Sequence, residues 1–168
     1  MEMNRGKPSH TIGRIGEFIA YQYLLQNCGP VKFGYFSDFV LYGVPIEVKT
    51  TTEHNHHRKT SGLGSFTFNR NNHTWLCEHG GKYVLVLLRD DGGASVKIWD
   101  AREVKLPQGA DTYKHTKWTQ FFEYTSGKQN FKRCTAPIFM NWSSLVTTAV
   151  VDQERMFALE QQRRGRFI

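Results

Sequence analysis

Three residues that could act together on a phosphate lie close in the sequence: Asp38, Glu47 and Lys49. Glu47 and Lys49 are two positions apart in an apolar, β-branched segment, so on a strand their side chains share one face. Asp38 belongs to a neighbouring apolar run, and Gly43 supplies a turn, so a hairpin would bring Asp38 opposite Glu47. Two carboxylates beside an ammonium group suit a magnesium ion, a phosphate and a water that must be activated.

The elements that must position these residues follow from the hydrophobic pattern. Apolar residues recur every three or four positions over about 11–26, which predicts a helix, and 31–51 is expected to form two or three short strands. A second helix is expected over 71–79. The apolar run 83–88 predicts a strand buried on both faces, and 94–99 an alternating strand that pairs back on it.

The length of 168 residues predicts a single domain with its own core. We expect a closing helix near 145–162 and a basic C-terminal tail. No apolar run is long enough to cross a membrane, and the first residues lack the apolar run of a secretory signal. Three widely spaced cysteines favour reduced thiols, so we expect a cytoplasmic protein that is not secreted.

The charge of the chain is basic, with 22 Lys and Arg against 15 Asp and Glu, a net charge of +7. The excess is greater in 101–168, which hold 11 basic and 6 acidic residues, than in 1–100, which hold 11 and 9. A basic surface favours polyanions such as nucleic acid. Charge alone fits a basic protein without such a partner equally well.

The expected elements and the candidate catalytic residues follow in a fixed order along the chain. A helix carries Glu17, one strand carries Asp38, the next strand carries Glu47 and Lys49, and a second helix and a buried strand follow. This order resembles the PD-(D/E)XK nuclease superfamily, the fold of many restriction enzymes and of archaeal Holliday-junction resolvases. The resemblance covers roughly 11–90. It implies a catalytic core over about 11–100, with room over 101–168 for a DNA-binding or oligomerising elaboration. It implies an α/β, restriction-endonuclease-like core, in which α-helices flank a central mixed β-sheet.

Two local motifs carry this resemblance besides the Glu-x-Lys pattern. The segment 13–17 (GRIGE) is similar to the helical glutamate motif of resolvase-like members. Ser37-Asp38 stands where the family often has Pro-Asp. Taken singly, Glu47 and Lys49 also fit an exposed strand face of mixed charge, and Glu17 fits a solvated helix position.

The resemblance implies a role for each of these residues. Asp38 and Glu47 would hold one or two Mg²⁺ ions, which Mn²⁺ could replace, with the Val48 carbonyl as a further oxygen ligand. Lys49 would orient or deprotonate the attacking water and offset the charge that grows on the phosphorane. Glu17 would complete the metal site or hold a water bound to the metal.

Candidate DNA contacts lie in polar and basic segments. His54, His56 and His57 lack the fixed spacing of a zinc site, so we expect their loop to touch the phosphate backbone rather than to bind metal. The aromatic and basic stretch 113–133 could line a nucleic-acid groove, although its aromatic residues fit core packing at least as well. The DNA-binding candidates are His57, Arg58, Lys59, Ser65, Asn69, Arg70, Lys114, Lys117, Arg163, Arg164 and Arg166.

Together these patterns predict a magnesium-dependent DNA endonuclease acting on double-stranded or branched DNA. It would be either a site-specific enzyme of homing or restriction type or a structure-specific enzyme such as a Holliday-junction resolvase. One active site cuts one strand, so we expect a homodimer or a higher symmetric oligomer. The alternatives are an inert nucleic-acid-binding module with the nuclease fold, and a nuclease that acts on RNA.

Overall fold

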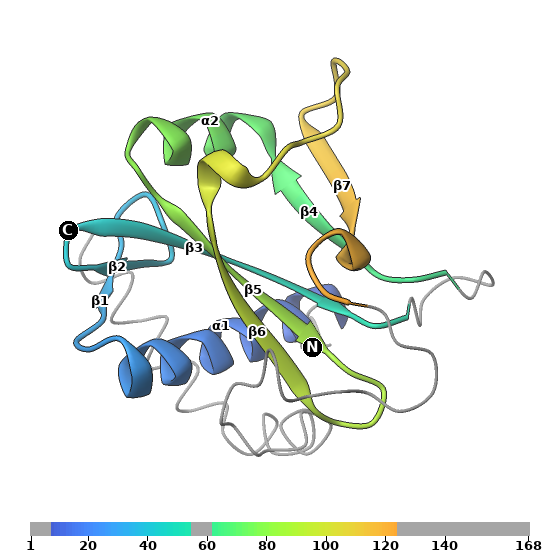
Figure 1. Cartoon of the computed structure of the whole chain (residues 1–168), viewed down its shortest axis with the longest axis horizontal. Coiled ribbons are helices and arrows are strands. Elements are labelled where there is room, and N and C mark those ends of the chain that lie inside the picture. The colour runs from blue at the N-terminus through green and yellow to red at the C-terminus, as the bar shows by residue number, and fades with distance from the viewer. Residues whose placement is uncertain (1–7, 55–61, 124–168) are drawn as a thin grey trace, which may run out of the picture.

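The computed structural model describes residues 8–54 and 62–123 (Figure 1). The helices are α1 (Pro8–Asn27) and α2 (Arg70–Glu78), with short 3-10 helices η1 (Ala101–Glu103) and η2 (Trp118–Gln120). The strands are β1 (Lys32–Phe33), β2 (Phe39–Leu41), β3 (Val44–Thr52), β4 (Ser65–Asn69), β5 (Lys82–Leu88), β6 (Ala94–Asp100) and β7 (Tyr113–Lys117).

Five strands form a central mixed sheet in the order β1-β2-β3-β5-β6. The β3–β5 pair is parallel, and the other neighbours are antiparallel. The chain crosses from β3 to β5 through β4 and α2, and β6 returns along β5 as predicted. The expectation of an α/β, restriction-endonuclease-like core with a mixed sheet flanked by helices is therefore confirmed (Figure 1).

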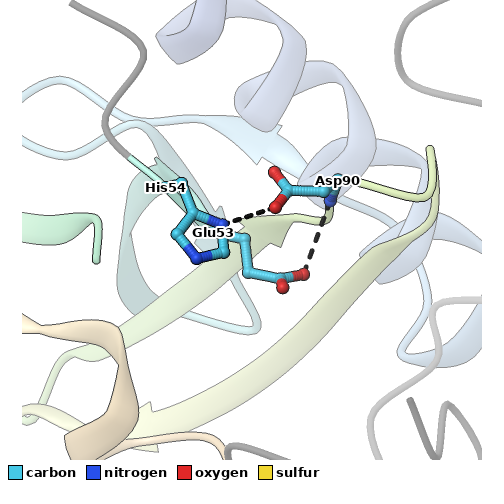
Figure 2. Close-up of side chains that lie close together, drawn as sticks. All are labelled: Glu53, His54 and Asp90. Carbon is cyan, nitrogen blue, oxygen red and sulfur yellow. Dashed lines mark hydrogen bonds and ion pairs between the residues drawn. The ribbon is translucent and has the colours of Figure 1, made fainter. Parts of the chain in front are cut away.

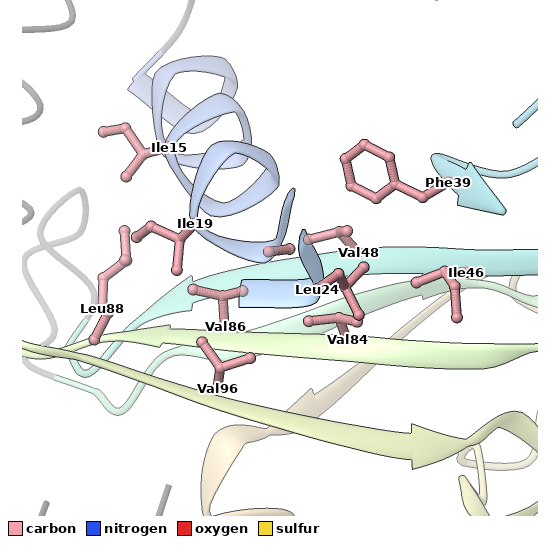
Figure 3. Close-up of a cluster of buried hydrophobic side chains, with 12 residues drawn as sticks. Ile15, Ile19, Leu24, Phe39, Ile46, Val48, Val84, Val86, Leu88 and Val96 are labelled. Carbon is pink, nitrogen blue, oxygen red and sulfur yellow. The ribbon is translucent and has the colours of Figure 1, made fainter. Parts of the chain in front are cut away.

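One face of the sheet is covered by α1. Its residues Ile15, Ile19 and Leu24 are buried in a cluster with Ile46 and Val48 of β3 and with alternate residues of β5 (Figure 3). The helical spacing predicted for this segment thus forms a core-facing stripe. The helix begins at Pro8, three residues earlier than expected, which is compatible with proline because the first helical N–H needs no partner.

The other face is covered by α2 together with a second, two-stranded sheet formed by β4 and β7. The pairing joins Ser65 to Lys117 and Asn69 to Tyr113, segments that lie about fifty residues apart in sequence. The sequence pattern did not predict this sheet. Of the two interpretations of the aromatic residues, a nucleic-acid groove or core packing, the structure supports core packing for three that are buried here: Trp118, Phe121 and Phe122.

The remaining sequence expectations concern the helices and the membrane. Helix α2 spans Arg70–Glu78, one residue earlier than predicted at each end. The closing helix expected near 145–162 lies outside the described residues. Within the described residues, neither helix combines the length and the apolar character that a membrane crossing requires.

Candidate active site

The β2–β3 hairpin positions the three candidate catalytic residues Asp38, Glu47 and Lys49. The two strands are joined at Tyr42 and Gly43, which both have positive φ angles, 49° and 79°. Such a two-residue loop matches the twist of the paired strands, and glycine adopts it without strain. The register pairs Phe39 with Ile46, so Asp38 lies one residue beyond the last pair, on the level of Glu47. The predicted hairpin and its Gly43 turn are confirmed.

Asp38 is held in a tight loop just before β2. Its side chain is buried, and its Oδ2 accepts a hydrogen bond of 2.8 Å from the N–H of Val48. The Gly34 N–H donates to the Asp38 carbonyl at 3.2 Å, which closes the loop. A side chain at Gly34 would begin only 2.3 Å from the Ser37 carbonyl oxygen, so the loop requires glycine there. The backbone therefore fixes where the Asp38 carboxylate points.

The backbone of Val48 presents its polar edge to Asp38. The N–H and the carbonyl of one strand residue point to the same side of the strand. Because the Val48 N–H meets Asp38, its carbonyl also faces this side, past the end of the β2 pairing. Two oxygen donors, a carboxylate and a carbonyl, thus lie on one edge of β3.

Glu47 and Lys49 share the face of β3 that lies opposite the α1 core. Both side chains are 21% exposed, and Lys49 Nζ lies 3.9 Å from Glu47 Oε1. The neighbours Ile46 and Val48 are buried on the other face, as the alternation predicted. The structure thus places Asp38, Glu47 and Lys49 at adjacent positions of one hairpin, with Asp38 buried and with Glu47 and Lys49 partly exposed.

A buried tyrosine lies beside Glu47 on the neighbouring strand. Tyr83 is the register partner of Glu47, and its hydroxyl lies 2.7 Å from His73 Nδ1 of α2. Burial, and next the nearby charge of Glu47, raise the pKa of Tyr83 well above its usual value. Burial also lowers the pKa of His73, against a smaller opposing effect of a hydrogen bond with the Val104 backbone. We therefore expect a neutral phenol and a neutral imidazole behind Glu47.

No pattern in the sequence indicates the contact between Tyr83 and His73. Tyr83 belongs to an apolar run that fits an ordinary buried strand, and His73 lies on a polar helix. The only local signal is a hydroxyl in an otherwise aliphatic strand. The contact between the two residues depends on how α2 docks on the sheet.

Glu17 lies on α1, which packs against β3 on the other face of the sheet. It follows Gly16 on α1, and a Cβ at Gly16 would lie 1.6 Å from Oγ1 of Thr50 on β3. The close approach of α1 to β3 thus occurs at Gly16, whereas Gly13 has nothing within 4 Å of such a Cβ. Glu17 is half-buried. In the described part of the chain, Glu17 does not form a compact three-ligand group with the hairpin carboxylates.

A separate group of potential metal ligands lies at the carboxyl ends of the parallel strands β3 and β5. Glu53, His54 and Asp90 bring one ligand atom each to within 4.8 Å of one another (Figure 2). The His54 ring and the Asp90 carboxylate form a close hydrogen bond, and Glu53 accepts a 3.4 Å hydrogen bond from the Asp90 N–H. Arg89 Nη1 lies 3.7 Å from Glu53 Oε1, so a guanidinium already balances this buried carboxylate.

The sequence places His54 in a polar loop, and no local pattern singles out Glu53 or Asp90. They come together because parallel strands place their carboxyl ends at the same edge of a sheet. The donors suit a divalent cation chemically. The cation would have to compete with Arg89 for Glu53. The histidines His56 and His57 lie outside the described residues.

The predicted DNA-binding residues of β4 and α2 differ in their exposure and in the hydrogen bonds that they form. Ser65 begins β4 and is half-buried. Asn69 caps α2, and its Oδ1 accepts from the N–H groups of Asn71 and Asn72 at 2.9 and 3.1 Å. Arg70 is exposed at the helix start and donates to the Gly109 carbonyl at 3.3 Å. Arg70 therefore has the accessibility that a phosphate contact needs.

The lysines of β7 also differ. Lys114 is only 5% exposed, and its ammonium donates to the Gly109 carbonyl at 2.9 Å, so it stabilises the loop before β7. Lys117 is exposed and donates to the Leu63 carbonyl at 2.9 Å. The remaining candidates, His57, Arg58, Lys59, Arg163, Arg164 and Arg166, lie outside the described residues.

Comparison with known proteins agrees with this architecture. A family model described as a PD-(D/E)XK nuclease superfamily domain matches residues 9–132. This match extends beyond 11–90, the part over which the sequence motifs carry the resemblance. Neither the curated proteins nor the solved structures gave a match. The family match covers most of the chain and includes α1, the β2–β3 hairpin, α2 and β5. The chain belongs to the PD-(D/E)XK nuclease superfamily.

Proposed function

We propose that this nuclease-family protein is a magnesium-dependent endonuclease that hydrolyses phosphodiester bonds in DNA. The observation that carries the proposal is the convergence of Asp38, Glu47 and Lys49 on the β2–β3 hairpin, inside the matched domain. Family membership supports a nuclease, and such nucleases typically use divalent metals.

The donor set of the hairpin fits a hard divalent cation. Carboxylates of Asp38 and Glu47 and the carbonyl of Val48 are oxygen ligands, which Mg²⁺ prefers, and it keeps several waters besides. When bound there, the ion would polarise the phosphate and make a bound water more acidic. Glu17, on the far side of the sheet, would act through a metal-bound water rather than as a direct ligand.

The protein's own residues would position the reactants. The hydrogen bond from the Val48 N–H fixes one Asp38 oxygen in place before any ligand arrives. Lys49 is close enough to Glu47 to be held toward the site, and its ammonium would orient the attacking water and offset charge on the phosphorane. Tyr83 is paired with Glu47 on the neighbouring strand β5, so its buried phenol would help to hold Glu47 in place.

The partner that we propose is double-stranded or branched DNA, and a homodimer or a higher symmetric oligomer would be needed to cut both strands. A site-specific enzyme of homing or restriction type and a structure-specific enzyme of Holliday-junction-resolving type remain the two forms of this proposal. A net charge of +7 supports a polyanionic substrate. An inert nucleic-acid-binding module is disfavoured because binding alone does not need the two carboxylates beside the phosphate.

A cleavage panel tests the proposal. The purified chain would be incubated with supercoiled plasmid, a four-way DNA junction and a matched RNA duplex, each with Mg²⁺, Mn²⁺ or EDTA. We expect cutting of DNA that requires metal, and preference for plasmid or junction would separate the two forms. Cutting of RNA alone would overturn the choice of substrate. Salt-sensitive binding without cutting of any substrate would favour the inert module.

A further inference from the structure

Four aromatic rings form a cluster next to the candidate active site: Tyr35, Phe36 and His79, which are exposed, and Trp75, which is half-buried. Phe36 is 73% exposed and Tyr35 58%, and their rings meet edge to face at 4.6 Å. Phe36 lies 5.7 Å from Trp75, which stacks on His79 at 4.2 Å. Two elements far apart in sequence thus contribute to one aromatic cluster. A large side chain as exposed as Phe36 gains little from burial, so folding alone does not account for it.

The aromatic cluster is tied to the site through the backbone. Tyr35 and Phe36 are in the tight loop whose ends are joined by the hydrogen bond between Gly34 and Asp38. The Asp38 carboxylate is therefore held only two residues from the exposed Phe36 ring. A ligand whose phosphate reached Asp38 would bring its neighbouring groups close to this ring.

The other half of the aromatic cluster lies on the helix that covers the Glu47 face. His73 of α2 contacts Tyr83, the strand partner of Glu47, and Trp75 packs beside the same core. The aromatic cluster consequently lies on the side of the sheet that carries Glu47 and Lys49. The cluster and the ion pair of the candidate site would face the same ligand.

Stacking on bases is the chemistry that exposed aromatic rings offer to nucleic acid. Every base has two flat faces, so an aromatic ring binds any base that is not covered by its neighbours. Bases inside an intact duplex have both faces covered, whereas single-stranded ends, flaps, branch points and flipped bases do not. The adjacency to Asp38 and the membership of the chain in a nuclease superfamily favour a nucleic acid over a protein partner here.

We propose that the aromatic cluster is a stacking platform for an unpaired base next to the phosphate that is cut. This inference rests on the proposed nuclease function and names its substrate class: DNA with an unpaired nucleotide at the scissile position. Phe36 supplies the outermost ring, and Trp75 supports it from α2. The platform would raise affinity for branched, gapped or single-stranded sites over continuous duplex.

The test compares two DNA probes of the same sequence. One is a continuous duplex, and the other carries a short unpaired stretch with a 2-aminopurine base in it. Dissociation constants are measured in EDTA, where metal-dependent cutting is absent, for the wild type, Phe36→Ala and Phe36→Trp. Tyr42→Asn is the matched control, because Tyr42 is 75% exposed at the hairpin turn and lies outside the aromatic cluster.

We expect the wild type to prefer the probe with unpaired bases and to quench its 2-aminopurine fluorescence. Phe36→Ala should bind that probe about 5- to 150-fold more weakly, the range for loss of one stacked base, with little change for the duplex. Phe36→Trp should restore the preference, and Tyr42→Asn should keep it. Circular dichroism would verify that each variant is folded.

The outcomes separate this inference from the function on which it rests. If the wild type neither binds nor cuts DNA, the proposed function fails and the platform with it. If the wild type cuts DNA while Phe36→Ala keeps the full preference for unpaired bases, only the platform is wrong. A change of oligomeric state in Phe36→Ala, with the preference unchanged, would identify the aromatic cluster as an interface between copies and would equally overturn the platform.

Discussion

The carboxylate of Asp38 accepts a hydrogen bond from the backbone N–H of Val48, ten residues further along the chain, at 2.8 Å. This contact joins the residue before β2 to the middle of the Glu-x-Lys strand. It gives Asp38 a structural role in addition to its proposed role as a metal ligand. The two roles can be separated because one needs only an acceptor oxygen and the other needs a negative charge.

Substitution of Asp38 should separate stability from activity. Asp38→Asn keeps an oxygen that can accept from Val48, so the free energy of unfolding should change little while cleavage is lost. Asp38→Ala leaves the N–H unpaired in a buried position and should cost about 1–3 kcal/mol as well. Urea unfolding and plasmid cleavage measure the two effects. Cleavage by Asp38→Asn at the wild-type rate would remove Asp38 from the active site.

Two glycines of α1 should respond in opposite directions to alanine. At Gly16 the new Cβ would lie 1.6 Å from Thr50 Oγ1, so α1 must move away from β3, at a cost of about 1–3 kcal/mol. At Gly13 nothing lies within 4 Å, so alanine should gain about 0.5–1 kcal/mol of helix propensity. Chemical denaturation of the two variants measures both changes. Equal stabilisation by both would contradict the close contact of α1 with β3.

The stability of the protein should depend on the protonation of His73. Burial lowers the pKa of His73 below its ordinary value of 6.5, so the unfolded chain binds the proton more readily. This contribution should be fully present above about pH 6.5 and should be lost as the pH falls below it, by at most about 1.4 kcal/mol per pH unit. Thermal or urea unfolding between pH 8 and pH 5 would measure it.

His73→Gln is the variant that isolates this effect, because glutamine keeps polar atoms near the Tyr83 hydroxyl but does not titrate. Its stability difference from the wild type at pH 8 gives the cost of the substitution itself. We expect that difference to shrink as the pH is lowered. A difference that stays constant to pH 5 would mean that His73 titrates as it does in the unfolded chain.

The buried ion pair of Glu53 with Arg89 should respond strongly to loss of one partner. Arg89→Met leaves the Glu53 carboxylate buried without its cation and removes the 2.8 Å hydrogen bond to Ser95, so a loss of about 3–5 kcal/mol is expected. The double variant Glu53→Gln, Arg89→Met should recover part of it. Lys105→Met, at an exposed position, is the control. A loss no larger than that of the control would argue against an ion pair that stabilises the fold.

Local pattern was sufficient for the elements that carry the candidate site. The alternation around Glu47 and Lys49 and the glycine at 43 predicted the hairpin, because strand period and turn residues are encoded over a few positions. The apolar run 83–88 likewise predicted the buried β5, and the spacing of Ile15 and Ile19 predicted the face of α1. Each of these features depends only on near neighbours in sequence.

Contacts between distant segments could not be predicted in this way. The β4–β7 pairing, the Tyr83–His73 hydrogen bond and the Glu53–Arg89 ion pair depend on docking of whole elements. The position of Lys114 shows the same limit, since its basic character does not indicate that its side chain is buried and that its ammonium donates to the Gly109 carbonyl. The sequence gives the charge of a side chain but not the group that the charged atoms contact.

The measurement that tests the central claim most directly is single-turnover cleavage of DNA by Glu47→Gln and Lys49→Ala, with binding measured in parallel in EDTA. The matched control is Lys82→Ala, because Lys82 and Asp100 form an ion pair of the same 3.9 Å length as Lys49 and Glu47 but outside the candidate site. We predict that the first two variants bind DNA nearly as the wild type does and cleave it at least about 100-fold more slowly. Lys82→Ala should cleave normally. Wild-type cleavage rates in Lys49→Ala or Glu47→Gln would contradict the assignment of the hairpin as the active site.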